Sequence, residues 1–252
     1  ALLSALVHGL RRWDVGASRQ PDHFVANSSA VAARILRAYG RHAEIIHPPI
    51  DIDRFRPGGE TGDYYLVLAR LVSYKRIDLA VEACKRLGRK LLIIGDGSDR
   101  ERLEEMAGPT IHFLGRVGDA EVEGYAARCR ALIFPGEEDF GMAPVEVAAA
   151  GRPTIAFRGG GAVETIVDGT TGVFFDRQEP EDVVAAIERF EEKTWSSEAI
   201  RSHAEGFGVD AFQTRFRAFL ERVGAPVSDA RAFPMADAGA AAGTKAKAPA
   251  VA

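Results

Sequence analysis

The sequence predicts an α/β fold in which helices cover both faces of a parallel sheet. The first observation is that short apolar runs alternate with helical segments between residues 64 and 175, which is typical of a doubly wound sheet with right-handed crossovers. Most of these runs are apolar on both faces, as buried parallel strands are. The third observation is the glycine content, 26 of 252 residues, which provides for many tight strand–helix turns. The apolar runs predict about six strands, which fit the usual dinucleotide-binding strand order.

The first part of the chain (residues 1–50) is expected to hold a few short elements. They are a helix over 1–10, a strand over 22–27, a helix from Ser28 or Ser29 to Tyr39, and a strand over 43–46. The apolar stretch at 1–10 is too short to span a membrane, and its positive charges follow it, whereas a signal peptide places them first. Two prolines, Pro48 and Pro49, prevent the last strand from continuing.

The main domain is expected over residues 61–224. Its strands are predicted at 64–69, 90–94, 111–114, 131–134, 154–157 and 172–175. Its helices are predicted at 77–87, 99–106, 120–129, 144–150, 163–167, 180–192, 196–205 and 209–223, and the last three close the domain. Residues 1–50 are interpreted as the remnant of an earlier domain, 51–60 as an interdomain linker, and 225–252 as a disordered Ala-rich tail.

Composition and charge exclude several classes of protein. Apolar residues make up 46% and charged residues 27% of the chain, which excludes wholesale disorder and a membrane-spanning bundle. The net charge of -4 gives no basic field for nucleic acid. The only cysteines, Cys84 and Cys129, lack metal-ligand spacing, so neither a disulfide scaffold nor a zinc ribbon is expected. A reducing cytoplasm is the default compartment.

Cationic residues follow the first main strand. Arg70, Lys75 and Arg76 lie in a loop that leads into a helix, and ligands bind an open parallel sheet beyond the carboxyl ends of its strands. A helix N-terminus favours anions, and Arg and Lys add charge-assisted hydrogen bonds. The loop therefore indicates a diphosphate site. The alternative is a solvated basic loop.

Glycine-rich loops follow two other strands. The turn Gly95-Asp96-Gly97 would let the backbone approach a ligand, or it is a plain turn. The three glycines at 159–161 fit either a close approach to a ligand or a flexible hinge. No G-x-G-x-x-G stands directly after a strand, which argues against a standard NAD site and an NAD-dependent oxidoreductase.

The loop after the fourth strand leads to a pair of carboxylates. Glu138 lies in the loop, and Pro144 is expected at the first position of the next helix, which puts Glu146 in the first turn. Carboxylates accept hydrogen bonds from sugar and ribose hydroxyls. Backbone N–H groups would be free at this helix start to hold hydroxyl or phosphate oxygens, namely those of Phe140, Gly141 and Met142. The alternative is a favourable interaction with the helix dipole, which explains Glu146 better than Glu138.

These residues together are similar to those of a known family. The sequence resembles the retaining glycosyltransferases of group 1, family 4, which have the GT-B fold, and the resemblance covers about residues 22–223. The segments that carry it are 69–72 with 75–76, 94–97, 113–117, 138–141 with Glu146, 151–156, 159–164 and 168–172. This version is most like bacterial mannosyltransferase-type members that act on surface polysaccharides.

The resemblance implies a role for each matching residue. Arg70 and Lys75 would neutralise the donor diphosphate, Glu138 would accept from the donor sugar and is the candidate catalytic residue, and Glu146 would accept from the ribose. The other binding residues implied are Gly95, the segment 114–117 with Val117 near the nucleobase, and Phe140, Gly141 and Met142 through their backbone. No protein nucleophile is established for the family, so the contribution would be electrostatic and positional. No metal or other cofactor is expected beside the GDP- or UDP-linked donor.

The resemblance further implies a hexosyltransferase that acts with retention on a nucleotide-sugar, with mannose as the candidate hexose. The family places its active site between two Rossmann-like domains, and the first is expected here only as residues 1–50. We therefore expect this chain alone to bind the donor without transferring the sugar. The alternatives are a non-catalytic nucleotide-sugar-binding module and a GT-B sugar-nucleotide epimerase.

The expected partners are the nucleotide-sugar donor and a glycan or lipid-linked acceptor, without nucleic acid. We expect a cytoplasmic location. Through the missing domain, we also expect peripheral association with the cytoplasmic face of the membrane. The sequence sets no expectation for the oligomeric state.

Overall fold

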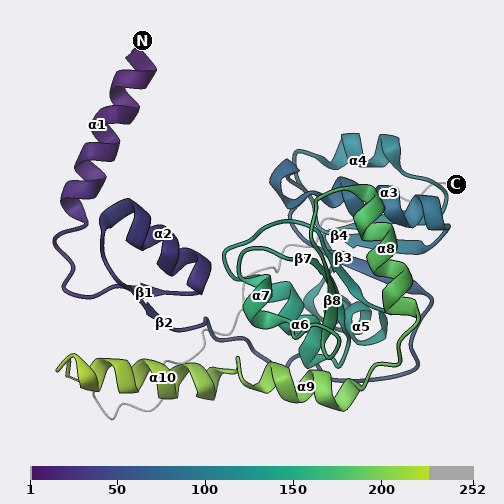
Figure 1. Cartoon of the computed structure of the whole chain (residues 1–252). Helices are drawn as coiled ribbons and strands as arrows, with labels where there is room; N and C mark the ends of the chain where they lie inside the picture. The colour runs from purple at the N-terminus through teal and green to yellow at the C-terminus, as the bar shows by residue number, and fades with distance from the viewer. Residues whose placement is uncertain (1, 227–252) are drawn as a thin grey trace, which may run out of the picture. The chain divides into compact units, whose positions relative to one another are not determined.

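The computed structural model describes residues 2–226 of the chain (Figure 1). Backbone contacts divide the chain into one unit over residues 1–216 and a second over 217–252. The described part of the second unit is the end of one helix and the residues directly after it. Residues 227–252 of the expected tail lie outside the described residues.

Helices and a two-stranded parallel sheet make up the first part of the chain. The elements are α1 (Leu2–Ala17), β1 (Val25–Ala26), α2 (Ser29–Tyr39) and β2 (Glu44–Ile45). The hydroxyl of Ser28 accepts from the N–H of Val31 at 3.2 Å, so Ser28 is the N-cap of α2 as the sequence allowed. Helix α1 runs beyond the predicted end at Leu10, because no proline or turn signal stops it before Ala17.

A six-stranded parallel sheet forms the centre of the main domain, in the order β5-β4-β3-β6-β7-β8. Its strands are β3 (Tyr64–Leu68), β4 (Lys90–Ile94), β5 (Ile111–Gly115), β6 (Leu132–Phe134), β7 (Thr154–Phe157) and β8 (Gly172–Phe175). This order confirms the predicted doubly wound sheet. It also places a reversal of strand order between β3 and β6, which are direct neighbours in the sheet.

The helices of the main domain follow the predicted sequence of elements. They are α3 (Ile77–Leu87), α4 (Arg100–Met106), α5 (Asp119–Arg128), α6 (Met142–Ala149), α7 (Ala162–Thr165), α8 (Pro180–Glu191), α9 (Ser197–Glu205) and α10 (Val209–Arg222). A 3₁₀ turn, Ser73–Lys75, precedes α3. Within residues 2–226, no helix combines the length and the apolar character needed to cross a membrane.

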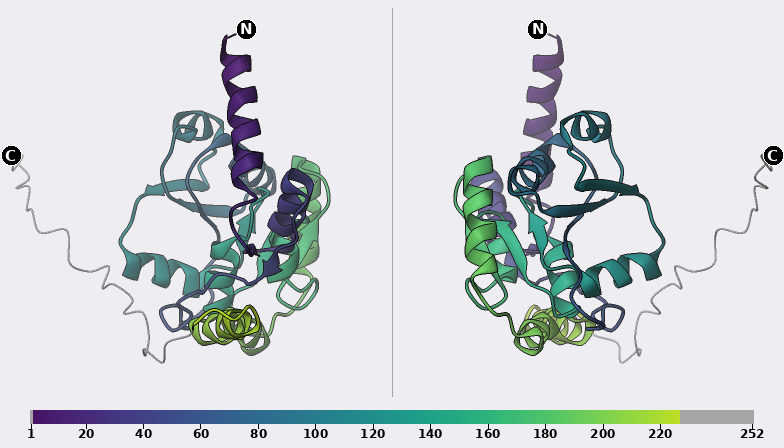
Figure 2. Two further views of the ribbon diagram at one scale, coloured as in Figure 1. Left: turned by 90° about the vertical axis from the view of Figure 1, so that its left-hand side faces the viewer. Right: turned by 90° about the vertical axis from the view of Figure 1, so that its right-hand side faces the viewer.

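Two hydrophobic cores lie on opposite faces of the sheet. Along β3, Tyr65 and Val67 point into one core and Tyr64 and Leu66 into the other, because successive strand residues face opposite sides. Helices α5, α6, α7 and α9 cover the Leu66 face, and α3, α4 and α8 cover the Tyr65 face. Figure 2 shows α5 in teal and α8 in green on opposite sides of the sheet. The crossovers therefore shield both faces from water.

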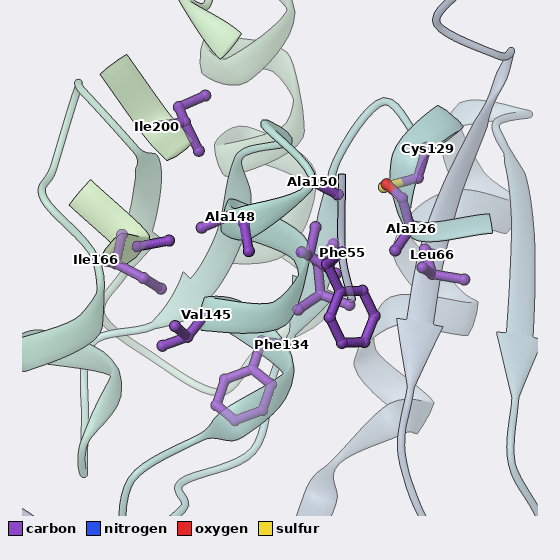
Figure 3. Close-up of a cluster of buried hydrophobic side chains, with 14 of the residues drawn as sticks. Phe55, Leu66, Ala126, Cys129, Phe134, Val145, Ala148, Ala150, Ile166 and Ile200 are labelled. Atoms are coloured by element: carbon purple, nitrogen blue, oxygen red, sulfur yellow. The ribbon is translucent and has the colours of Figure 1, made fainter. Parts of the chain in front are cut away.

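The segment before β3 is held against the Leu66 face. Phe55 is 2% exposed and packs into the core of that face, where Figure 3 shows it near Leu66 and Ala150. The guanidinium of Arg201 donates to the carbonyl oxygen of Phe55 at 2.8 Å and to that of Ala149 at 2.6 Å. These contacts attach residues 51–60, the expected linker, to α6 and α9.

We predict that neither cysteine reacts with a thiol reagent while the chain is folded. Cys84 and Cys129 are both buried, and burial raises the pKa of each thiol to about 12. At pH 8 this leaves about a thousandfold less thiolate than an exposed cysteine has. Labelling with Ellman's reagent should therefore be slow in buffer and complete in guanidinium chloride. Rapid labelling of either thiol in the native protein would show that the corresponding core is open.

Candidate functional site

A cavity of about 770 Å³ opens at the carboxyl end of the sheet. Its walls come from the ends of β3, β4 and β6, the loop after β5, and the loop that leads into α6. The reversal between β3 and β6 creates this opening, since α3 leaves β3 toward one face while α6 leaves β6 toward the other. A volume of this size matches sites for nucleotide-sized ligands.

The structure brings all of the sequence-predicted binding residues into the wall of this single cavity. They are Arg70, Lys75, Gly95, Val117, Glu138, Phe140, Gly141, Met142 and Glu146. They come from the loops after β3, β4 and β5 and from α6 with the loop that leads into it, which are separated in the sequence. The position of each loop at the end of a neighbouring strand is what gathers them.

The cations after β3 divide into two groups. Arg70 and Lys75 line the cavity, whereas the guanidinium of Arg76 turns to Asp78 and to the carbonyl oxygen of Gln178, each at 3.3 Å. Arg76 also has a left-handed backbone with φ 50° as it leads into α3. Arg70 is exposed and forms no hydrogen bond or ion pair through its side chain with residues 2–226. Its charge is therefore available to a ligand.

Gly95 is needed for the close approach of two strand ends. It has φ +132°, and a Cβ there would overlap the carbonyl oxygen of Ala69. Its N–H donates to the carbonyl oxygen of Gly115 at 2.8 Å, which ties the loops after β4 and β5 together. Gly95 therefore lines the cavity and also allows the ends of the strands to pack closely. A plain turn would require only its backbone conformation and not this close packing, so the interpretation as a plain turn is too simple.

Lys75 and Glu138 form an ion pair inside the cavity. The Nζ atom of Lys75 donates to Oε1 of Glu138 at 2.7 Å, with side-chain exposures of 16% and 23%. Such a half-buried pair is screened less by water and salt than a surface pair. Each group neutralises the charge of the other, so neither charge requires a ligand to neutralise it. Sequence reasoning assigned the two residues to different parts of a ligand and did not predict their contact.

Helix α6 begins earlier than predicted, which corrects the position of Glu146. The helix starts at Met142 after Gly141, which has φ 83°, so Pro144 is the third helical residue and Glu146 lies beyond the first turn. Proline is tolerated there because the first four N–H groups of a helix have no partner within it. The correction leaves Glu146 at the cavity wall.

Glu146 presents an uncompensated carboxylate to the cavity. Its side chain makes no hydrogen bond or ion pair with the residues that the structure describes, 2–226. Burial raises the pKa of the Glu146 carboxyl, and the charge of Arg54 opposes this shift. A half-buried acceptor without a hydrogen-bond partner is what a hydroxyl donor from a ligand would satisfy.

Backbone donors lie beside these carboxylates. In the described part of the chain, no acceptor pairs with the N–H groups of Phe140, Gly141 and Met142. They stand at the start of α6, where the helix dipole adds a positive potential. The arrangement suits hydroxyl or anionic oxygens.

The three glycines at 159–161 support the loop that carries Glu138. The N–H of Gly161 donates to the carbonyl oxygen of Glu138 at 2.8 Å, and a Cβ on Gly160 would overlap that oxygen. Gly160 also has φ +57°. The glycines are not part of the cavity wall. Residues 135–141 are called the Glu138 loop below. The three glycines allow their own loop to pack directly against the backbone of the Glu138 loop.

Sequence reasoning assigned no role to three charged or polar residues of the cavity, Asn27, Asp96 and Asp139, and it placed Arg116 only within the segment expected near the nucleobase. Arg116 directly follows β5, and the rule that sites lie beyond the carboxyl ends of strands indicates a ligand contact at this position. Its side chain is exposed and forms no hydrogen bond or ion pair within residues 2–226. No pattern in the sequence pointed to Asn27, because it comes from the first part of the chain.

The charges of the cavity fall into compensated and uncompensated groups. Lys75 pairs with Glu138, while Asp139 pairs with Arg34 at 2.7 Å. Arg70, Arg116 and Glu146 are left without side-chain partners among residues 2–226. Free guanidinium groups can bind phosphate oxygens, and a free carboxylate can accept from hydroxyls. In residues 2–226, no cluster of three or more His, Cys, Asp or Glu side chains could hold a metal ion.

Comparison with known proteins places this geometry in a family. The family model described as "Glycosyl transferases group 1" matches residues 50–207, which contain the whole sheet and most of the cavity wall. A GDP-mannose-dependent alpha-(1-6)-phosphatidylinositol monomannoside mannosyltransferase of Mycolicibacterium smegmatis is 30% identical over 187 residues. That alignment covers 62% of this chain and 49% of the mycobacterial protein. The chain spans about half the length of the curated relatives it matches.

Solved structures share the fold at lower identity. The sucrose-phosphate synthase of Thermosynechococcus elongatus superposes with a TM-score of 0.76 at 19% identity, covering 84% of this chain and 61% of that one. The Anabaena protein HepE, in complex with UDP and glucose, gives a TM-score of 0.71 at 21% identity over 84% of this chain and 66% of its own. The likeness confirms the predicted GT-B type of architecture.

We predict that Glu146→Gln stabilises the folded chain at neutral pH and not at pH 4. Because the folded-state pKa of Glu146 is raised, folding favours its protonated form, and the charged form opposes folding as the pH rises above the ordinary value of 4.5. Removing the charge should add on the order of 1 kcal/mol to the free energy of unfolding at pH 7, as replacement of a functional buried charge often does.

Urea denaturation of both proteins at pH 7 and pH 4 measures this difference. Glu105→Gln, which changes an exposed carboxylate on α4, is the matched control and should leave the free energy of unfolding unchanged at both values. A Glu146→Gln variant that is less stable than the parent at pH 7 would contradict the prediction.

Proposed function

This chain belongs to the glycosyl transferases group 1 family, and on that premise we propose that its cavity binds the nucleotide-sugar donor of a hexosyltransferase. The reaction proposed is transfer of a hexose, with mannose as the candidate, to a glycan or lipid-linked acceptor with retention of configuration. The single observation that carries the proposal is the set of uncompensated groups in one cavity, Arg70, Arg116 and Glu146.

The proposal assigns the parts of the donor along the cavity. The diphosphate lies at Arg70 and Lys75, beyond the end of β3. The ribose lies at Glu146, whose half-buried carboxylate lacks a donor within residues 2–226, and the nucleobase lies toward Val117. The transferred sugar lies at Glu138 and at the N–H groups before α6. This order follows the walls of the cavity from β5 to the Glu138 loop.

The Lys75–Glu138 pair gives the site a way to respond to its ligand. A diphosphate carries more negative charge than a carboxylate, so the ammonium group of Lys75 turns to it and releases Glu138. Glu138 is then free to accept from a sugar hydroxyl. As the sugar–phosphate bond breaks, Arg70 and Lys75 stabilise the charge that develops on the leaving diphosphate, and Glu138 stabilises the cationic sugar. These cations supply the countercharge at the diphosphate, so the proposal includes no metal or cofactor.

The relatives support the choice of substrate class. The mycobacterial relative is GDP-mannose-dependent by name and acts on a phosphatidylinositol monomannoside, and the HepE structure holds UDP and glucose. We therefore include both GDP- and UDP-linked hexoses as candidate donors. A lipid-linked acceptor would put the enzyme at the cytoplasmic face of a membrane.

We predict that Arg70→Ala and Lys75→Ala each weaken binding of UDP and GDP as well as of UDP-glucose and GDP-mannose. A lost charged hydrogen bond costs about 1.5–3 kcal/mol, which corresponds to a loss of roughly 10- to 150-fold in affinity. Isothermal titration of each variant with the nucleotide that the parent chain prefers measures the loss.

Arg102→Ala serves as the control for these variants. Arg102 lies on α4 outside the cavity and pairs with Asp99 at 2.6 Å, so its loss should not change nucleotide affinity. Equal affinity of the parent, Arg70→Ala and Lys75→Ala proteins for every nucleotide would remove the diphosphate site from the proposal.

We predict that Glu138→Gln and Glu146→Gln change nucleotide affinity in opposite directions. Glu138→Gln leaves Lys75 without a charged partner, so free UDP or GDP should bind about fivefold more tightly, the difference between a charged and a neutral hydrogen bond. The same variant should bind the sugar-bearing donor less well relative to the free nucleotide. Glu146→Gln should weaken both ligands, because both contain ribose.

Titration of both variants with the free nucleotide and with the nucleotide-sugar separates these effects. If Glu138→Gln and Glu146→Gln weaken binding of the free nucleotide equally, the division into a sugar and a ribose carboxylate is wrong.

A further inference from the structure

We propose that Asn27 is a further substrate-binding residue, whose side-chain amide contacts a hydroxyl of the sugar carried by the donor. The inference rests on the proposed function, which names the ligand of the cavity. It adds a contact from outside residues 50–207, the segment that the family model matches. The site is then built by both parts of the chain rather than by the main domain alone.

The first observation is the position of Asn27. It directly follows β1 and lines the same cavity as Arg70, Glu138 and Glu146. It is the only residue of the first part of the chain, among those the structure describes, that belongs to this cavity wall.

The second observation is that the amide of Asn27 lacks a partner. Its Oδ1 atom is the one buried side-chain oxygen or nitrogen within residues 2–226 that has no hydrogen bond. Buried polar atoms are nearly always hydrogen-bonded in native proteins, so an exception requires an explanation. An amide carries an acceptor and a donor group that exchange places on rotation, and a sugar hydroxyl can satisfy either one.

The third observation is that the segment around Asn27 is fixed to the main domain. The N–H and the hydroxyl of Ser29 both donate to Oε1 of Glu164, at 2.8 and 2.7 Å, and Nε2 of His47 lies 2.9 Å from the other carboxylate oxygen. Burial raises the pKa of Glu164, but the hydrogen bonds from His47 and Ser29 outweigh it and hold that pKa below its ordinary value. Glu164 therefore stays ionised and holds both residues.

The same segment reaches the sugar end of the cavity rather than the nucleobase end. The guanidinium of Arg34 pairs with Asp139 at 2.7 Å, and the ring of His47 stacks on Phe140 with centroids 5.5 Å apart. Both contacts are to the Glu138 loop, which the proposed function places at the transferred sugar. We therefore assign Asn27 to the hexose end of the cavity rather than to the base.

The experiment compares sugar recognition in Asn27→Ala and Asn27→Leu. The leucine variant fills the space of the asparagine without offering a hydrogen bond, so it separates loss of the amide from loss of volume. Calorimetric titration with UDP, UDP-glucose, GDP and GDP-mannose measures each affinity. Gln20→Ala removes an exposed amide of the same part of the chain, outside the cavity, and is the matched control.

Both Asn27 variants should bind the free nucleotide within twofold of the parent chain. They should bind the preferred nucleotide-sugar about tenfold less tightly, the size of one hydrogen bond. Gln20→Ala should match the parent for every ligand. Melting temperatures check folding, and removal of a buried unsatisfied amide should not lower that of Asn27→Leu.

The outcomes separate this inference from the function on which it rests. If the parent chain binds none of the four ligands, the proposed function fails and the inference with it. If the parent binds them and the Asn27 variants lose nothing, or lose free nucleotide and nucleotide-sugar equally, the inference alone is overturned. A more stable Asn27→Leu with unchanged sugar discrimination would make Asn27 a purely structural residue.

Discussion

The reversal of strand order between β3 and β6 is the constraint on which the site depends. A helix must follow each strand to cover the sheet, and the reversal sends α3 to one face and α6 to the other. The loops after β3 and β6 consequently lead to opposite faces of the sheet, although Gly136 and Lys75 still pack closely where the two loops meet. The space left between them is the cavity, and its walls are the carboxyl ends of strands buried on both faces. The two cores therefore fix the positions of Arg70 and Glu138 without contacting a ligand.

Charge balance explains why this cavity is a site rather than a packing defect. Burying an uncompensated charge is unfavourable, and the structure avoids it by pairing the half-buried Lys75 and Glu138. Glu146 is the exception, since burial raises its pKa and no side chain within residues 2–226 donates a hydrogen bond to its carboxylate. Stability is lost at such a position, and a ligand restores it. The ion pair between Lys75 and Glu138 neutralises both charges before a ligand binds. A diphosphate can then replace Glu138 as the partner of Lys75.

Two groups of contacts hold the Glu138 loop in position, one from the glycines at 159–161 and one from the first part of the chain. Gly160 and Gly161 let a second loop pack against its backbone, and the N–H of Gly161 fixes the carbonyl oxygen of Glu138. From the other side, Arg34 holds Asp139 and His47 packs on Phe140. Because α7 carries Glu164, which binds Ser29 and His47, one helix connects both supports. The geometry of the site is thus set by residues that line no part of the cavity.

The sequence by itself determined the strands, the helices, the strand order and the loops that meet at the cavity. These follow from local patterns, such as the apolar runs of β3 to β8 and the cations or carboxylates directly after them. Only the tertiary structure decided that Lys75 pairs with Glu138, that Arg76 turns away to Asp78, and that α6 begins before Pro144. It alone also placed Asn27 at the cavity and made the glycines at 159–161 a support for another loop. The physical reason is that each of these features depends on distances and packing in three dimensions, often between segments that are far apart along the chain. A sequence pattern reports only the structural preferences of residues that are close together in the sequence.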